Sequence, residues 1–168
     1  MQWIKSDYAK HSFFVERDFV WTVQKKLTEI LAREQSQFNL FNDYPIEPGS
    51  RRSICVDLAV ASRGICYKDV QTGEAQLEFV AEFKFEPSKV RPDIMSHKLP
   101  VVEWSAVLED INRIRRYVGN RSAKTGVSVF IDELGLNRSR PVDSHSQWLD
   151  WGPCNLSNLN LSVLWTTY

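Results

Sequence analysis

Residue types that suit metal-assisted hydrolysis occur in two stretches that look like strands. Asp57 lies in ICVDLAVA, and Glu82 and Lys84 lie in LEFVAEFKFE. Residues two apart in a strand leave the same face, about 6 to 7 Å apart along the chain, so Glu82 and Lys84 share a face. A charge inside an apolar strand is costly unless a partner lies close. If the two strands are neighbours, Asp57 sits opposite Glu82, and a cation between the carboxylates would relieve their repulsion.

Magnesium is the cation that fits this arrangement, because Mg²⁺ prefers oxygen ligands and keeps several of its waters. Bound there, it would polarise a phosphate and acidify a water molecule. Lys84 would orient or deprotonate that water and offset the developing negative charge. We therefore expect Asp57 and Glu82 as metal ligands and Lys84 as a catalytic helper. The alternative is that the triplet is a solvated, inert part of an exposed strand face, with Asp57 capping a neighbouring backbone or paired to Lys84 or Arg52.

The elements that must position these residues follow from the spacing of apolar side chains. Helical spacing predicts amphipathic helices from about Val15 to Gln35 and from about Glu103 to Val118. Alternation predicts strands in the two stretches above, joined as an antiparallel meander, and in TGVSVFIDEL. The turn-rich tract FNLFNDYPIEPGS is expected to hold a short edge strand at most. SQWLDW is interpreted as a helical turn and NLSVLWTTY as a final strand. This order predicts an α/β fold, a mixed sheet with helices packed on it.

An Asp on one central strand and Glu82-Phe83-Lys84 on the next resemble the PD-(D/E)xK nuclease superfamily, which has the restriction-endonuclease-like fold. Its core runs helix, three-strand meander, helix, strand. The resemblance covers about residues 13–132 and leaves 133–168 as a small C-terminal appendage of a single domain, 1–168. It departs from the family pattern at Val56, where many members have Pro, and in the long segment between Asp57 and the triplet.

The resemblance implies a Mg²⁺-dependent nuclease, with Mn²⁺ as a substitute, that hydrolyses phosphodiester bonds of DNA or sometimes RNA. Endonucleases of this kind often act as a homodimer or within a larger nuclease assembly. The resemblance also implies a further metal-shell acid from the first helix. Of Glu16, Glu29 and Glu34, we choose Glu16, because it lies one turn ahead of Val20 and Val23 on the stripe that faces the sheet. The alternative is a first-turn acid that the helix dipole favours.

The second predicted helix carries the candidate nucleic-acid contacts, Arg113 and Tyr117, which are four residues apart and off its predicted apolar stripe. They belong to the densest basic cluster of the chain, with Arg115, Arg116, Arg121 and Lys124. In related nucleases this helix contributes phosphate contacts. A solvated helix face is the alternative interpretation.

The composition limits these expectations without deciding them. The 168 residues include 21 basic and 21 acidic side chains, and neutrality counts against DNA binding by the whole surface, although a local basic patch remains compatible with it. The three cysteines are too few and scattered for a disulfide framework, and Cys55 is expected as a small buried side chain. We expect no membrane segment and a cytoplasmic location, because there is neither a long apolar run nor a signal-peptide core. The neutral charge also favours an alternative function, a binding or assembly module that kept the nuclease fold without catalysis.

Overall fold

Six strands form one mixed sheet in the computed structural model, which describes residues 2–11, 13–93, 101–153 and 160–168. The described strands are β1 (Phe38–Glu47), β2 (Ile54–Ser62), β3 (Leu77–Glu86), β4 (Ala123–Asp132), β5 (Ser146–Pro153) and β6 (Asn160–Thr167). The described helices are α1 (Gln2–Asp7), α2 (Glu16–Arg33), α3 (Tyr67–Gln71) and α4 (Trp104–Gly119), with a short 3₁₀ turn at Tyr8–Lys10. The predicted α/β class is confirmed. None of these described helices is both long and apolar enough to cross a membrane.

The strand order across the sheet is β1-β2-β3-β4-β6-β5. The first three strands form the predicted antiparallel meander. β3 and β4 run parallel, which requires a crossover connection, and α4 lies in that connection. β6 then pairs antiparallel with both β4 and β5. Neighbouring strands of the described sheet are therefore antiparallel, except for the parallel pair β3 and β4 at its centre.

Three expectations about the strands were wrong in detail. The turn-rich tract does form the expected edge strand, β1, but this strand has ten residues and is not short. It tolerates Pro45 because it lies at the sheet edge, where a missing N–H is not costly. SQWLDW is not a helical turn but most of β5. The segment 133–168, expected as an appendage, contributes β5 and β6 to the same sheet. Pairing with a neighbouring strand decides these segments, since β1 pairs with β2 and β5 with β6, and local residue patterns do not report such pairing.

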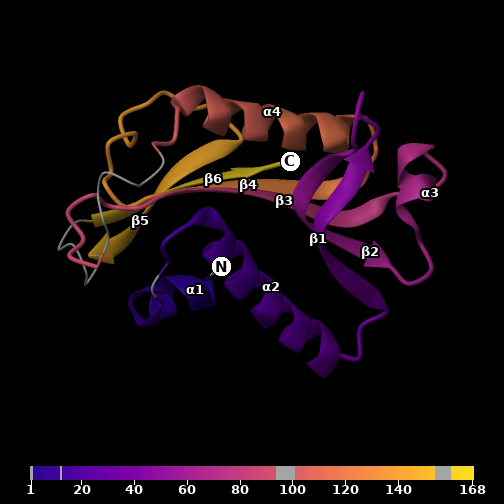
Figure 1. The fold of residues 1–168 in the computed structure, drawn as a ribbon, viewed down its shortest axis with the longest axis horizontal. Coiled ribbons are helices and arrows are strands. Elements are labelled where there is room, and N and C mark those ends of the chain that lie inside the picture. The colour runs from indigo at the N-terminus through magenta and orange to yellow at the C-terminus, as the bar shows by residue number, and fades with distance from the viewer. Residues whose placement is uncertain (1, 12, 94–100, 154–159) are drawn as a thin grey trace.

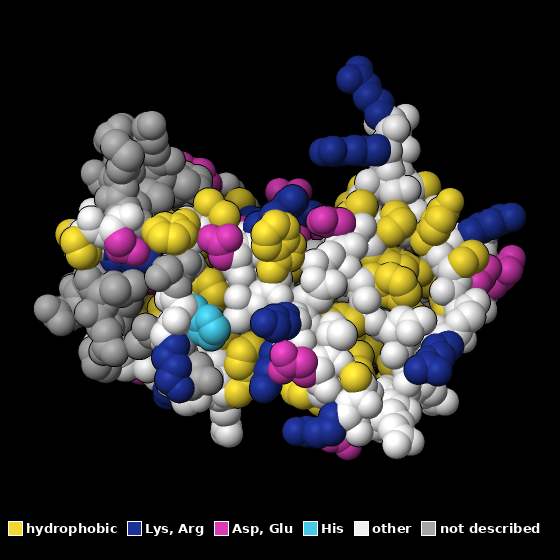
Figure 2. All heavy atoms as spheres, turned by 60° about the horizontal axis from the view of Figure 1, so that its bottom comes forward, with side chains coloured by type: hydrophobic (Ala, Val, Ile, Leu, Met, Phe, Trp, Pro, Cys, Tyr) yellow, Lys and Arg dark blue, Asp and Glu magenta, His cyan; other side chains and the backbone are white. Residues whose placement is uncertain are grey.

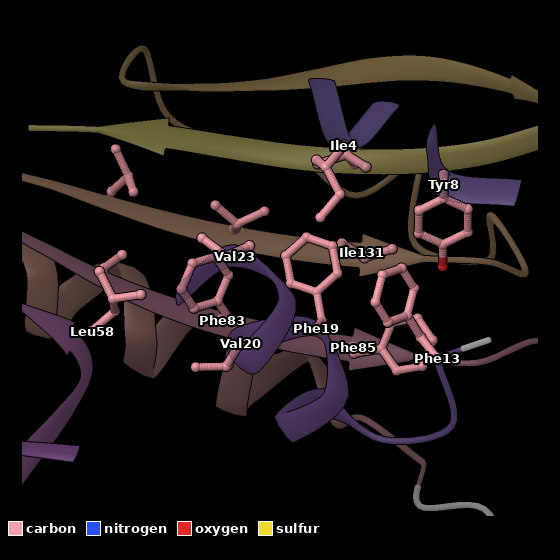
Figure 3. Close-up of a cluster of buried hydrophobic side chains, with 14 of the residues drawn as sticks. Ile4, Tyr8, Phe13, Phe19, Val20, Val23, Leu58, Phe83, Phe85 and Ile131 are labelled. Carbon is pink, nitrogen blue, oxygen red and sulfur yellow. The ribbon is translucent and has the colours of Figure 1, made fainter. Parts of the chain in front are cut away.

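One face of the sheet is covered by α1 and α2, seen below the sheet in Figure 1. The α2 side chains Phe19, Val20 and Val23 are buried in this layer. They pack with sheet residues that Figure 3 labels, among them Leu58, Phe83 and Ile131. Fully burying each such side chain contributes about 1.5–3 kcal/mol, so this layer holds the start of α2 firmly beside β3.

The opposite face is covered by α4, seen above the sheet in Figure 1. Ile114 of α4 packs with Val80 of β3, and Gly126 of β4 lies beneath them. A Cβ atom at Gly126 would lie 2.8 Å from Ile114 Cγ2 and 3.0 Å from Val80 Cγ2, closer than side chains normally approach. The glycine therefore lets α4 lie close to β3, the strand that carries Glu82 and Lys84.

The buried stripe of α4 differs from the predicted one. Leu108, expected inside, has 40% of its surface exposed. The buried side chains are Val107, Asp110, Ile111, Ile114 and Tyr117. The helix therefore turns an acid and a tyrosine toward the sheet, where the sequence pattern had predicted only apolar residues.

Candidate functional site

The candidate site lies where β2 and β3 separate. The register between these strands runs from Val60 and Phe79 to Leu58 and Ala81, and the paired residues end there. Asp57 and Glu82 are the next residue on each strand. Past the last pair, the backbone N–H of Phe83 donates a 2.8 Å hydrogen bond to Asp57 Oδ2. The Asp57 side chain thus ties the two strands together at the point where their backbones part.

Glu82 is almost completely buried, with 1% of its surface exposed. Its Oε2 atom lies 3.2 Å from Nη2 of Arg113, whereas its buried Oε1 atom has no hydrogen-bond partner. Burial, followed by the negative charge of Asp57, raises the pKa of Glu82 to about 9. Glu82 therefore carries a proton at neutral pH in the metal-free protein, and one of its oxygens has unused capacity to accept a ligand.

Lys84 connects the two helices through ion pairs. Its Nζ atom lies 3.2 Å from Asp110 Oδ2 on α4 and 3.4 Å from Glu16 Oε2 on α2. Burial alone would lower the pKa of Lys84, but the charges of Asp110 and Glu16 raise it above its ordinary value. Lys84 is therefore an ammonium ion at neutral pH.

Glu16 lies close to the other predicted site residues, at the first residue of α2. Burial raises the pKa of its carboxyl group, and the charge of Lys84 partly offsets this effect. The two acids that we set aside lie elsewhere on the surface of α2, where Glu29 pairs with Lys26 and Glu34 with Arg33. The structure thus brings Glu16, of the three candidates, next to Lys84.

Asp110 is a member of the site that sequence reasoning missed. Only 3% of its side chain is exposed, and it contacts both Lys84 and Arg113. Burial raises its pKa, and the two cations oppose that rise. The sequence could have indicated this position, because Asp110 lies three residues after Val107 and four before Ile114, on the same helical stripe. An acid on an apolar stripe is costly without a partner, and here it has two.

Arg113 and Tyr117, the candidate nucleic-acid contacts on α4, lie in different surroundings. The prediction that Tyr117 lies off the apolar stripe of α4 is wrong. Its side chain is completely buried, because its helical spacing from Val107 and Ile114 turns it toward the sheet. Such a side chain cannot reach a phosphate. The side chain of Arg113 is only 23% exposed and pairs with Glu82 and Asp110. It therefore belongs to the group of acids formed by Glu16, Asp57, Glu82 and Asp110, here called the acidic cluster, and not to a solvated helix face.

A cavity of about 740 Å³ lies next to this cluster. Its lining includes Arg113 and Cys55, the residue two positions before Asp57. Cys55 was expected to be buried but is exposed, as is Cys66, and Cys154 lies outside the described residues. Arg113 thus touches both the acidic cluster and this cavity, and Cys55 places the cavity beside the strand that carries Asp57.

The carboxyl groups at this site determine whether it can hold a divalent cation. Within the described residues, no group of three or more His, Cys, Asp or Glu side chains is arranged to hold a metal ion. Mg²⁺ is commonly bound by only one or two carboxylates, together with water and substrate phosphates. Asp57 and Glu82 provide two adjacent carboxyl groups, and Oε1 of Glu82 has no hydrogen-bond partner. This pair fits Mg²⁺ once Glu82 releases its proton, whereas the predicted three-acid set with Glu16 does not form a metal-holding group among the described residues.

No protein-family model, no curated protein and no solved structure matches this chain. The geometry of Asp57, Glu82 and Lys84, and the residues that hold them, are therefore what indicates a function.

Proposed function

We propose that this protein is a Mg²⁺-dependent nuclease of the PD-(D/E)xK type, which hydrolyses phosphodiester bonds of nucleic acid, in the first place DNA. The observation that carries the proposal is the convergence of Asp57, Glu82 and Lys84 at the point where β2 and β3 separate. The Asp57 charge acts on Glu82 and on Lys84, so all three side chains lie in one electrostatic environment.

The order of the elements supports a restriction-endonuclease-like core. A helix, a three-strand antiparallel meander, a second helix and a strand parallel to the third follow one another as α2, β1–β3, α4 and β4. This is the order that the sequence resemblance implied, with α3 as an insertion between β2 and β3. In this interpretation β5 and β6 extend the core sheet.

Each residue has a distinct role in the proposed reaction. Asp57 and Glu82 would hold Mg²⁺, which when bound polarises the phosphate and lowers the pKa of a water molecule. The ammonium group of Lys84 orients the water and offsets negative charge on the phosphate. Its raised pKa favours this role over that of a general base. Glu16 and Asp110 hold Lys84 between them and thereby position it.

Cleavage assays test this proposal most directly. Supercoiled plasmid DNA and DNA and RNA oligonucleotides are incubated with the protein and Mg²⁺ or Mn²⁺. We expect cleavage by the parent protein and a loss of at least about 100-fold in Lys84→Ala, the lower range for removing one group that acts on the reacting atoms. Lys68→Ala is the matched control, because Lys68 is an exposed lysine on α3. No cleavage of any substrate by the parent, or equal rates in parent and Lys84→Ala, would contradict the proposal.

Metal binding is measured separately by titration calorimetry with Mn²⁺. We expect binding to the parent protein and its loss in Asp57→Asn, because that change removes one of two ligand charges. Binding that is unchanged in Asp57→Asn would place the metal elsewhere.

A second candidate function is a binding or assembly module without catalysis. The contacts of Arg113 and Lys84 with Asp110 favour it, because they balance buried charges without a metal. This candidate predicts neither cleavage nor Mn²⁺ binding at Asp57, so the same two experiments distinguish it from a nuclease.

A further inference from the structure

We infer that the cavity beside the acidic cluster binds the phosphate backbone of a nucleic-acid strand through Arg17, Arg51 and Arg52. The inference rests on the proposed function and names the surface that would present the substrate to it. It replaces the basic cluster on and after α4, which the sequence had suggested for this purpose.

The lining of the cavity is strongly basic. It includes Arg17 from the first turn of α2, Arg51 and Arg52 from the connection between β1 and β2, and Arg113 from α4. Among the described residues of the lining, the one acid is Asp43. Arg113 is already paired with Glu82 and Asp110, so three arginines against one acid leave the cavity net positive, which raises the local concentration of a polyanion. Figure 2 shows Lys and Arg side chains on a projecting part of the surface beside a hollow.

Three of the four cavity arginines have no acidic partner among the described residues. Arg17, Arg51 and Arg52 are exposed and make no ion pair with any residue that the structure describes. A guanidinium without a carboxylate partner can take a phosphate in a bidentate contact without first breaking an ion pair. These three side chains are therefore available to a ligand.

The basic cluster around α4 is largely neutralised by contrast. Arg115 pairs with Asp143, Arg116 with Glu47 at 3.0 Å, and Lys124 with Glu78 at 2.7 Å. Each of these acids is far from its basic partner in the sequence. The run of basic residues on and after α4 therefore does not give a matching density of unpaired positive charge on the folded surface. Among the described residues Arg121 is the one exposed member of this cluster without an ion pair, whereas the cavity has three such arginines.

The position of the cavity suits the proposed reaction. Arg113 lines it and contacts Glu82, and Cys55 lines it two residues before Asp57. A phosphate held by Arg51 and Arg52 would therefore lie on the approach to the acidic cluster. The same backbone would extend past Arg17 at the start of α2, next to Glu16.

The lining also indicates which part of the nucleic acid is recognised. No aromatic side chain lines the cavity among the described residues, so it has no platform for stacking bases. Guanidinium contacts to phosphates position a strand but do not specify its sequence. We therefore expect binding that is strongly dependent on salt and indifferent to base sequence.

The experiment measures binding without metal and without cleavage. Fluorescence anisotropy in EDTA follows a labelled 20-base-pair DNA duplex, its single strand and a version of scrambled sequence, between about 50 and 300 mM salt. We expect the double variant Arg51→Ala/Arg52→Ala to bind at least tenfold more weakly at low salt. Its plot of log affinity against log salt should be shallower by nearly two units, because each lost phosphate contact removes about 0.9 from the slope for duplex DNA. Arg17→Ala should remove about one unit.

Two controls make the result specific. Lys25→Ala removes an exposed cation from α2, the helix that carries Arg17, outside the cavity lining, and should change neither affinity nor slope. Arg115→Ala/Arg116→Ala removes two paired arginines from α4 and should have a much smaller effect than the cavity variant. Circular dichroism and thermal melting confirm that each variant is folded.

The possible outcomes separate this inference from the proposed function. Absence of binding by the parent protein, an unchanged salt slope in Arg51→Ala/Arg52→Ala, or an equal loss in Arg115→Ala/Arg116→Ala would overturn the inference. Sequence-independent binding that requires Arg51 and Arg52, in a protein that cuts no substrate, would support the cavity and contradict the nuclease. Cleavage that requires Lys84, with binding unaffected by Arg51 and Arg52, would support the nuclease and overturn the cavity.

Discussion

The carboxylate of Asp57 accepts a 2.8 Å hydrogen bond from the backbone N–H of Phe83, just past the last paired residues of β2 and β3. Phe83 is the middle residue of the Glu82-Phe83-Lys84 triplet, so this bond fixes the backbone that carries both charged side chains. The two halves of the motif, separated in the sequence, are thereby joined by one contact between side chain and backbone.

The buried Glu82 should make the protein less stable as the pH rises. The pKa of Glu82 is about 9 in the folded protein and 4.5 ordinarily, so between these values the folded state holds a proton that the unfolded state has released. Stability from this group is complete below pH 4.5, falls as the pH rises, and is lost above about pH 9. Glu82→Gln cannot ionise, so its advantage should grow across this window to a few kcal/mol, since one pKa unit is about 1.4 kcal/mol.

Urea unfolding at pH 5, 7 and 9 measures this difference. The control is Glu78→Gln on the same strand and the same pleat face, because a hydrogen bond from Lys124 lowers the pKa of Glu78. Glu78→Gln should not stabilise the protein at any of these pH values. A Glu82→Gln variant that is less stable than the parent at pH 9, or a difference independent of pH, would contradict the assignment.

Asp110 should act through Lys84. The charge of Asp110 helps to raise the pKa of Lys84, so Asp110→Asn should lower that pKa. If the ammonium form is the active one, the alkaline limb of the pH profile for cleavage should move to lower pH. The rate at neutral pH should fall by about 10- to 100-fold, the usual range for a group that positions another. Glu109→Gln, an exposed neighbour on α4, is the control. A lower rate with an unmoved alkaline limb would assign Asp110 to folding alone.

Much of the fold could be predicted from the sequence, because its central elements have regular patterns. The helix over Val15 to Gln35 is α2 (Glu16–Arg33), and the alternation around Asp57 and Glu82 corresponds to β2 and β3. The buried side chains of these elements follow regular helical or strand spacing, so the local pattern and the tertiary structure agree. β5 could not be recognised in the same way, because SQWLDW is a strand only by virtue of its pairing with β6.

The candidate site was predicted less completely, for an electrostatic reason. The pattern of α4 was interpreted on the assumption that its inner face is apolar, which placed Leu108 inside and Tyr117 outside. The actual face contains Asp110, whose burial is compensated by Lys84 from another element. Likewise, Arg116 seemed free because its partner, Glu47, lies on β1. Partners from distant parts of the chain decide whether a charge is buried or available, and one sequence does not report them.

Arg113 should compete with a metal ion for Glu82. Its guanidinium lies 3.2 Å from Glu82 Oε2, so it occupies an oxygen that Mg²⁺ would need and places a positive charge beside the metal position. Arg113→Gln should therefore bind Mn²⁺ about tenfold more tightly than the parent in the absence of nucleic acid, a difference of about 1.4 kcal/mol. Titration calorimetry measures it. Arg116→Gln is the control, because Arg116 pairs with Glu47. Equal or weaker Mn²⁺ binding by Arg113→Gln would show that the ion pair does not compete with metal.

The close approach of α4 to the sheet should depend on Gly126. A Cβ atom there would lie 2.8 Å from Ile114 Cγ2, so Gly126→Ala must displace α4 or a strand, at a cost of about 1–3 kcal/mol for overpacking. The same displacement moves Asp110 and Arg113 away from Lys84 and Glu82, so cleavage should fall even at a temperature where the variant is fully folded. The control is Gly119→Ala at the end of α4, where a new Cβ meets no atom within 4 Å. It should be neutral or slightly stabilising, because Ala restricts the unfolded chain more than Gly. Urea unfolding and plasmid cleavage, measured on both variants, check the prediction. A Gly126→Ala variant that is as stable and as active as the parent would mean that the separation between α4 and the sheet is not critical to the site.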